Sequence, residues 1–492
     1  MIFKPRDTKL WDTFILAHEG RFYLYYLSST RHFWDGYGLA VSEDLLHWKD
    51  HGVFLACTEG GMGTGMVWRA GNRWLLNYSL DQNIHFAESN DLMTWRKLPK
   101  EIVSRPDPRW YETDTAHASG SRRWDTICVE PDPDGDGFVG FITASANNGP
   151  PGGNGVCGFL RSHDGLRWEA GPPASAPCGI PWAEVGGHVS FGENHYLLVS
   201  SSTGIGARFG SVEPVVGKSA GCFVMHARKI EGPYTLASGD PLLLGSRCGL
   251  PIWGYTPAYF LRPLSGTGET LVNHHWMPRA SFVDAWLGTP KVLREEKPGT
   301  LALAYWTGCE KLKGKLLFDL ADPPGFLAPN PQPIPAARWE VKPGSVRGTT
   351  TASGVLRFDR DLPVSDGLVI EAELSMDGEG AAGFWFPDAT TNEQNPYPGA
   401  ACLANMRGVC EFGTVASGPC SPPFYREEFV PWTPVRKSMK WRILLRSEFI
   451  EWYINDRLIG CHGFSRIPAG PLGIYAERCR VALTHLKVWR FG

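Results

Sequence analysis

The sequence lacks the features that mark membrane, secreted and nucleic-acid-binding proteins. No apolar run approaches the roughly 20 residues that a membrane helix needs, so we expect no membrane partner. The segment from Met1 to Trp11 has no apolar core of a signal peptide, which predicts a cytoplasmic protein and leaves a longer secreted precursor open. The formal net charge is only -3 and no basic run occurs, which argues against a nucleic-acid partner.

Paired metal-ligating cysteines are also missing. The 12 cysteines are scattered without a C-x-x-C pair, so we expect no metal and no cofactor. Most should be small buried hydrophobic residues in a reducing compartment. A disulfide among Cys402, Cys410 and Cys420 stays open at this point.

Turn-forming residues and tryptophan are abundant instead. The chain has 57 glycines, 39 prolines and 20 tryptophans, and no window keeps a 3.6-residue apolar period for long. Many short strands separated by Gly and Pro turns predict an all-β fold. The tryptophans serve either inter-strand packing, which we expect for most of them, or stacking on sugar rings.

An internal repeat organises the first part of the chain. The pattern Ser-x-Asp-x-x-x-Trp occurs at 42–48, 89–95 and 162–168, each time after a strand-like run. Two less regular units follow at 180–234 and 253–293. Five such meanders predict a five-bladed β-propeller over residues 1–321.

The remainder of the chain has a different residue pattern. Residues 322–336 carry six prolines and predict a stiff, extended linker. Residues 337–492 alternate apolar and polar side chains and predict a β-sandwich, with Asn455 and Asp456 forming a hairpin turn.

Three acidic residues stand at similar places in three of the repeat units. Asp12 and Asp125 both follow a Trp and precede a Thr, and Glu184 opens the fourth unit shortly after Trp182. A carboxylate inside an apolar strand is costly unless it is paired or functional. Since the first strand of a propeller blade lines the central channel, we expect the three acids to converge there.

Three convergent carboxylates beside aromatic rings are typical of glycoside chemistry. One can protonate the leaving oxygen, one can attack the anomeric carbon or activate water, and one can hold the sugar. The alternative is that these acids cap turns or pair with arginines, namely Arg122, Arg123 or Arg208.

Two further motifs are open to a metal-binding and a structural interpretation. Asp132, Asp134 and Asp136 begin like a calcium loop, but the twelfth position is Thr143, so a hairpin turn is expected. The run 274–276, His-His-Trp, could line the channel or hold an ion. Without zinc-type spacing, a packed or hydrogen-bonded role is favoured.

The order and spacing of these motifs resemble the five-bladed propeller glycosidases of glycoside hydrolase families 32, 68 and 43, with family 32 closest in architecture. The resemblance extends to the run 34–42 and the glycine-rich run 60–65. It implies that Asp12 is the nucleophile, Asp125 the transition-state stabiliser and Glu184 the acid/base. The family motifs differ locally, because Trp11 and Thr13 flank Asp12 where family 32 has Asn and Pro, and Val185 follows Glu184 where it has Cys.

The resulting hypothesis is an exo-acting, retaining glycosidase that cleaves a furanoside such as a β-fructofuranoside. Its partner would be an oligosaccharide or glycoside, and a homo-oligomer stays open. The alternatives are an inverting arabinofuranosidase or xylosidase like those of family 43, and a non-catalytic carbohydrate-binding propeller. The expected substrate-binding residues are four stacking tryptophans, an arginine near the stabiliser and a histidine near the acid/base: Trp11, Trp34, Trp124, Trp182, Arg123 and His188.

Overall fold

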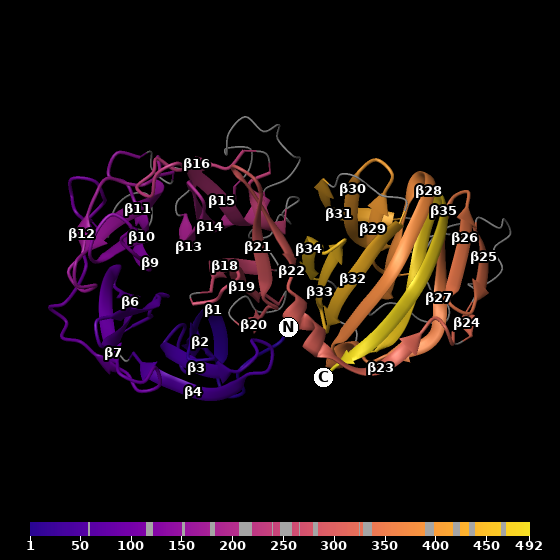
Figure 1. The fold of residues 1–492 in the computed structure, drawn as a ribbon, viewed down its shortest axis with the longest axis horizontal. Helices are drawn as coiled ribbons and strands as arrows, with labels where there is room; N and C mark the ends of the chain where they lie inside the picture. Colours follow the sequence, from indigo (N-terminus) through magenta and orange to yellow (C-terminus); the bar gives the residue numbers. More distant parts are fainter. Residues whose placement is uncertain are drawn as a thin grey trace. The chain divides into compact units, whose positions relative to one another are not determined.

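The computed structural model describes most of the chain and divides it into two compact units, Met1–Leu303 and Ala304–Gly492. It describes residues 1–57, 60–114, 122–149, 153–177, 183–205, 219–238, 240–246, 258–264, 266–278, 284–323, 325–327, 337–388, 398–416, 424–431, 438–463 and 469–492, with the backbone alone at 202–205 and 219–220. Within these residues, no helix is both long and apolar enough to cross a membrane. The chain is nearly all β, as predicted (Figure 1).

Unit 1 consists of small antiparallel sheets in a propeller-like arrangement (Figure 1). The first sheet contains β1 (Lys9–His18), β2 (Arg21–Ser29), β3 (Gly36–Ser42) and β4 (Lys49–Ala56). The second contains β5 (Val67–Ala70), β6 (Arg73–Leu80), β7 (Asn83–Ser89) and β8 (Arg96–Lys97). The third contains β9 (Trp124–Pro131), β10 (Phe138–Ser145), β11 (Gly155–Ser162) and β12 (Glu169–Ala170).

The last two groups of unit 1 are less regular. The fourth sheet contains β13 (Glu184–Phe191), β14 (Asn194–Ile205), β15 (Ser219–Ala227), β16 (Thr235–Leu236) and β17 (Leu242–Ser246). The fifth group contains β18 (Ala258–Pro263), β19 (Leu271–Trp276), β20 (Trp286–Leu287) and β21 (Lys291–Lys297). The expectation of five separate blades is slightly off, because in the described residues only the first four groups are sheets of their own.

The repeated Ser-x-Asp-x-x-x-Trp pattern forms the turn between the third and fourth strands of a sheet. In the first copy, Ser42 Oγ accepts a hydrogen bond from the Leu45 amide, and Asp44 Oδ1 accepts one from the His47 amide. The Trp48 indole N–H then donates to the Leu45 carbonyl at 3.1 Å. The other two copies make the same three bonds. The repeat is therefore a capped turn that closes each of the first three sheets.

The first strand of each group is the inner strand, and each inner strand carries one extra residue. Such a bulge disturbs the ladder locally and re-aims the side chains beside it. The register shifts lie between Trp11 and Thr13 in β1, between Gly63 and Val67 before β5, between Asp125 and Cys128 in β9, between Val185 and Gly187 in β13, and between Tyr259 and Arg262 in β18.

Hydrogen bonds between neighbouring inner regions join the sheets into a ring. The Asn77 side chain donates to the Ile127 carbonyl, which links the second and third sheets. The Val185 amide donates to Thr143 Oγ1, which links the fourth to the third. The Asn273 side chain donates to the Thr13 carbonyl and so joins the fifth group back to the first. The inner strands consequently face one common axis.

Unit 2 is a β-sandwich, also as predicted. It begins with part of β22 (Thr300–Tyr305) and continues with η1 (Thr307–Leu312), β23 (Lys313–Asp319), β24 (Phe326–Leu327), β25 (Ala337–Lys342), β26 (Ser345–Thr350), β27 (Ser353–Leu362) and η2 (Val364–Asp366). It ends with β28 (Leu368–Pro387), β29 (Gly399–Asn405), β30 (Val409–Val415), β31 (Phe424–Pro431), β32 (Ser438–Arg446), β33 (Phe449–Ile454), β34 (Arg457–Gly463) and β35 (Gly470–Phe491).

The long strands β28 and β35 pair with each other along most of their length. The first half of β28 pairs with β32 and its second half with β29, and a register shift between Gly378 and Ala381 separates the halves. Alternate residues of β28 face one shared core that includes Ile370 and Phe384. The predicted turn at Asn455 and Asp456 is confirmed, with φ of 51° and 65°.

Some expectations fall partly outside the described residues. Of the expected linker 322–336, residues 324 and 328–336 are not described, so the limits 1–321 and 337–492 stay a prediction. Cys402 and Cys410 are buried free thiols, and Cys420 lies outside the described residues.

Candidate active site

The three predicted acids lie near the beginnings of inner strands and therefore at one end of the ring. Asp12 is the fourth residue of β1, Asp125 the second of β9 and Glu184 the first of β13. Each lies within two residues of the bulge in its strand. Their positions relative to the bulge are similar but not identical. Asp12 is itself the extra residue of its strand, whereas Asp125 and Glu184 come before the extra residue of theirs.

Arg123 joins two of these acids directly. Its Nε donates to Asp125 Oδ2 at 2.9 Å, and its Nη2 donates to Glu184 Oε1 at 3.0 Å. About a fifth of the side-chain surface is exposed for both Arg123 and Glu184, against 7% for Asp125. Charge-assisted bonds of this kind fix geometry strongly when they are shielded from water. The sequence placed Arg123 near Asp125, and the structure shows that it also holds Glu184.

Tyr259 is a further member of the cluster that the sequence reasoning did not single out. Its hydroxyl donates to Glu184 Oε2 at 2.5 Å. Burial first, and then the Glu184 charge, raise the pKa of Tyr259 well above its usual value, so it stays protonated and able to donate. Its position in the repeat could have identified it from the sequence, because Tyr259 lies at the start of the fifth inner strand, where other units carry an acid.

Asp12 is the most unusual of the three acids. Its φ is +22°, in a region that residues with a Cβ rarely adopt, as a bulge position permits. Its Oδ1 is buried and, in the described part of the chain, accepts no hydrogen bond. Burial raises the pKa of Asp12 well above its usual range, and the charges of Glu184 and Asp125 raise it further. Arg262 and Arg123 oppose that rise, so all three acids share one electrostatic environment.

Trp11 lies against the cluster as part of an aromatic group. Its ring is 4.6 Å from the His275 ring, which in turn is 6.0 Å from Tyr259. Burial lowers the pKa of His275 to about 3, so this imidazole is neutral at physiological pH. Trp11, the one partly exposed ring of the three, therefore offers an aromatic surface next to Asp12 in the chain.

Trp34 lies in the loop between β2 and β3 and is only partly buried. Its carbonyl accepts the Met62 amide at 2.8 Å, which ties this loop to the glycine-rich run 60–65. That run approaches the cluster closely, because a Cβ on Gly63 would stand 3.8 Å from the Cβ of Asp125. The nearest atom to that Cβ would be Ser79 Oγ at 2.1 Å, so the position excludes a side chain because Ser79 already fills the space.

Two of the other predicted sugar contacts, Trp124 and His188, pack into the core of the sheets. Trp124 is fully buried, and its ring packs 4.9 Å from Tyr111, because it points to the strand face opposite Asp125. His188 is 8% exposed and stacks on Phe141 at 5.1 Å, with a 3.1 Å hydrogen bond to His195. Trp182 lies outside the described residues.

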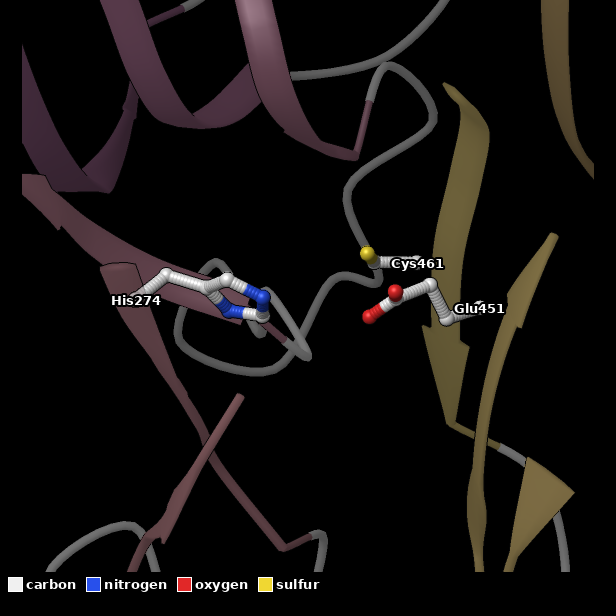
Figure 2. A group of neighbouring side chains, drawn as sticks. All are labelled: His274, Glu451 and Cys461. Atoms are coloured by element: carbon white, nitrogen blue, oxygen red, sulfur yellow. The ribbon is translucent and has the colours of Figure 1, made fainter. Parts of the chain in front are cut away.

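The candidate ion-binding motifs have other local partners. The Asp132 amide donates to the Gly137 carbonyl at 3.0 Å, which closes the predicted hairpin turn. Figure 2 shows His274 on β19, where Lys291 Nζ lies 2.8 Å from its Nε2. Figure 2 also shows Glu451 and Cys461, which are direct register partners on β33 and β34 of unit 2. The buried ammonium beside His274 competes with a cation for that nitrogen.

The fold is the one seen in solved structures of glycoside hydrolase family 32. No family model matches the sequence, and no curated protein sequence matches it either. A sucrose-6-phosphate hydrolase from Lactobacillus gasseri has a TM-score of 0.65 at 12% identity, covering 100% of this chain and 93% of that one.

Two further structures extend the similarity to animal and plant proteins. A mutant of the Bombyx mori family 32 β-fructofuranosidase in complex with sucrose has a TM-score of 0.60 at 13% identity, covering 99% and 93% of the two chains. Fructan 1-exohydrolase IIa from Cichorium intybus has a TM-score of 0.63 at 13% identity, covering 99% and 97%. The similarity therefore spans both units of the chain and establishes the fold.

Proposed function

We propose that this chain is an exo-acting, retaining glycoside hydrolase that cleaves a β-fructofuranoside or a related furanoside. The observation that carries the proposal is the joined cluster of three carboxylates at one end of the inner strands. Arg123 bridges Asp125 and Glu184, and Asp12 is electrostatically coupled to both. The fold similarity supports this choice, since the neighbouring structures include a β-fructofuranosidase bound to sucrose.

In the first half of the proposed reaction, Asp12 is the nucleophile and Glu184 the acid. An Asp12 carboxylate oxygen forms a bond to the anomeric carbon while the glycosidic C–O bond breaks, and a proton passes from Glu184 to the leaving oxygen. Among the described residues, Asp12 Oδ1 accepts no hydrogen bond, and such bonds would weaken the carboxylate as a nucleophile.

In the second half, Glu184 is the base. It takes a proton from water as that water attacks the anomeric carbon, and Asp12 leaves as the carboxylate. Tyr259 and Arg123 hold the two oxygens of Glu184 from opposite sides, which fixes its position through both steps. A phenol can accept as well as donate, so Tyr259 keeps its contact when Glu184 carries the proton.

Asp125 is assigned to stabilise positive charge that develops on the sugar ring. Both of its oxygens receive hydrogen bonds from Arg123, and Thr126 Oγ1 donates to Oδ1 at 2.9 Å. These bonds hold the carboxylate rigid before the substrate arrives, which is the condition for electrostatic stabilisation of a transition state.

The proposal is tested by comparing the wild type with Asp12→Asn, Asp125→Asn and Glu184→Gln on sucrose, fructo-oligosaccharides and aryl furanosides. We expect each substitution to lower kcat by at least about 10³-fold, because each removes a group used only in the reaction. Asp91→Asn, in a turn of the second sheet, is the matched control and should retain activity. Full activity of both the Asp12 and Glu184 variants would contradict the assignment.

Retention is tested separately by the configuration of the first product. Proton NMR of the newly released sugar should show the anomer of the substrate before mutarotation. The opposite anomer would favour the inverting alternative and would make Asp12 a base for water. A wild type that binds these sugars without cleaving them would favour a carbohydrate-binding propeller.

A further inference from the structure

A single buried arginine lies where the five inner strands converge. Arg262 on β18 is 2% exposed, and its guanidinium donates to the carbonyls of Gly65 at 2.8 Å and Gly186 at 3.1 Å. Its Nη2 lies 3.5 Å from Cys128 Sγ, and its Cζ lies 5.3 Å from the centroid of the Phe14 ring. These four residues belong to the inner regions of the second, fourth, third and first sheets.

The contacts of Arg262 coincide with the bulges. Gly186 is the extra residue of β13, Cys128 follows the bulge of β9, and Gly65 lies within the shifted segment before β5. Arg262 itself is the first residue after the bulge of β18. One side chain thus contacts the irregular segments of β9 and β13, near which Asp125 and Glu184 lie, and the segment before β5.

The charge of Arg262 has no direct partner. In the described part of the chain, no carboxylate lies within 4 Å of its guanidinium, whose neighbours are carbonyls, a thiol and aromatic rings. A buried cation without a counter-ion in contact is costly, because its desolvation is not offset by a direct ion pair. Asp12 is the complementary group, a buried carboxyl with one oxygen that accepts no hydrogen bond among the described residues, and the charge of Arg262 favours its ionised form.

We propose that Arg262 is a positioning residue for the site, which ties the bulged inner strands together and supplies the positive charge that keeps Asp12 ionised. The other charges that face Asp12 are Glu184, Asp125 and Arg123. Glu184 and Asp125 disfavour the carboxylate form, so Arg123 alone would have to offset two acids that it also binds. The proposed role in catalysis rests on the proposed function, whereas the effect on Asp12 ionisation does not.

The experiment titrates Asp12 directly by infrared spectroscopy. The protonated-carboxyl band is followed against pH as the difference between each protein and the same protein with Asp12→Asn. The backgrounds are wild type, Arg262→Lys and Arg262→Gln, with Arg262→Met as a second uncharged variant if the glutamine variant is insoluble. In Arg262→Gln, which lacks the positive charge, the acid ionisation constant of Asp12 should be at least tenfold lower than in the wild type. In Arg262→Lys, which keeps a positive charge, it should return close to the wild-type value. Equal titration of all backgrounds would overturn the proposal.

Arg122 provides the matched control. It is 5% exposed and also donates to backbone carbonyls, including that of Thr113 at 2.8 Å. Arg122→Gln should lower the melting temperature without moving the Asp12 titration. A shift equal to that of Arg262→Gln would show a general effect of buried arginines and would overturn the specific role. The titration needs no substrate, so inactivity toward every glycoside would contradict the proposed function alone.

The same variants separate positioning from mere structural support in the kinetics. The acidic limb of kcat/KM should move to higher pH in Arg262→Gln and stay near the wild-type position in Arg262→Lys. A structural role would lower activity equally at all pH values in both variants.

Discussion

At the scale of single residues, Asp12, the proposed nucleophile, lies in an environment that disfavours its charge. A nucleophile must be ionised, yet burial and two neighbouring acids raise its pKa. An active site gains from this combination, since a carboxylate poorly stabilised in the free protein is more reactive toward a developing cation. The arginines Arg123 and Arg262 set how far the pKa rises.

The pH profile should show this environment. In the proposed mechanism activity requires the Asp12 carboxylate, whose pKa is raised, so kcat/KM should fall as pH drops through a value above the ordinary aspartate range. A profile of kcat/KM from pH 3 to 8 measures the limb. A limb at the usual aspartate pKa would show that Asp12 is not the group that must ionise.

Glu130 offers a second residue-scale test, on stability. Burial raises the pKa of Glu130 from 4.5 to about 7. Between those values the unfolded chain loses the proton while the folded chain keeps it, so stability falls as pH rises. Glu130→Gln should remove this loss, raising the free energy of unfolding at pH 8 by about 1 to 3 kcal/mol relative to wild type.

Urea unfolding at pH 4.5 and pH 8 measures the effect of Glu130→Gln, and the difference between variant and wild type should be small at the lower pH. An equal change at both pH values would assign it to packing instead of ionisation.

At the scale of the elements, the bulges in the inner strands control where the acids point. Gly186 is the clearest case, because a Cβ there would stand 2.2 Å from the Leu261 carbonyl oxygen. The backbone cannot yield to relieve that contact without moving β13 or β18. The strand that begins with Glu184 is therefore held in place by the lack of a side chain two residues later.

Gly186→Ala should displace Glu184 and lower both stability and activity. We expect a loss of about 2 to 4 kcal/mol in the free energy of unfolding and at least about a tenfold loss in kcat. Gly268→Ala is the control, because nothing lies within 4 Å of a Cβ there. Normal activity in Gly186→Ala would show that the close approach does not position Glu184.

The sequence carried information on the turns but little on the bulges. The Ser-x-Asp-x-x-x-Trp repeat predicted the first three sheets because each of its residues makes a local hydrogen bond. A bulge has no such signature, since Asp12, Thr126 and Phe260 all occupy positive φ without being glycine. Trp124 was expected beside a sugar because it neighbours Asp125, but alternation along the strand sends it into the core.

The residues that contact the acids could not be identified from the sequence either. Arg262 and Tyr259 are remote from Asp12 and Glu184 in sequence, and only the closure of the ring brings them together. Local pattern therefore singled out the three acids, and long-range packing determined which residues contact them.

At the scale of the whole molecule, the two units have separate cores. In unit 2, the rings of Trp441 and Trp452 stack at 5.2 Å, and both are fully buried between the layers of the sandwich. Trp452→Ala removes one half of that stack and leaves a large cavity. The expected loss is about 3 to 5 kcal/mol in the free energy of unfolding of unit 2.

Hydrogen exchange followed on peptides from 304–492 measures this loss where it occurs. Tyr425→Ala is the control, because that side chain is 61% exposed and its removal should change stability by less than about 0.5 kcal/mol. Unchanged exchange in Trp452→Ala would show that the stacked pair is not central to the sandwich.

The extra residue in each inner strand has a consequence for how such a chain can evolve. Residues after the bulge must keep the alternation that packs the ring, whereas those at or before it can be an acid, a tyrosine or a glycine, as in Asp12, Tyr259 and Gly63. A duplicated unit can thus gain or lose a reactive group without being redesigned as a folding unit. The residue at the bulge and the packing of the sheet can then change independently of each other. Copies of one ancestral sheet could in this way come to carry different residues at the five inner positions.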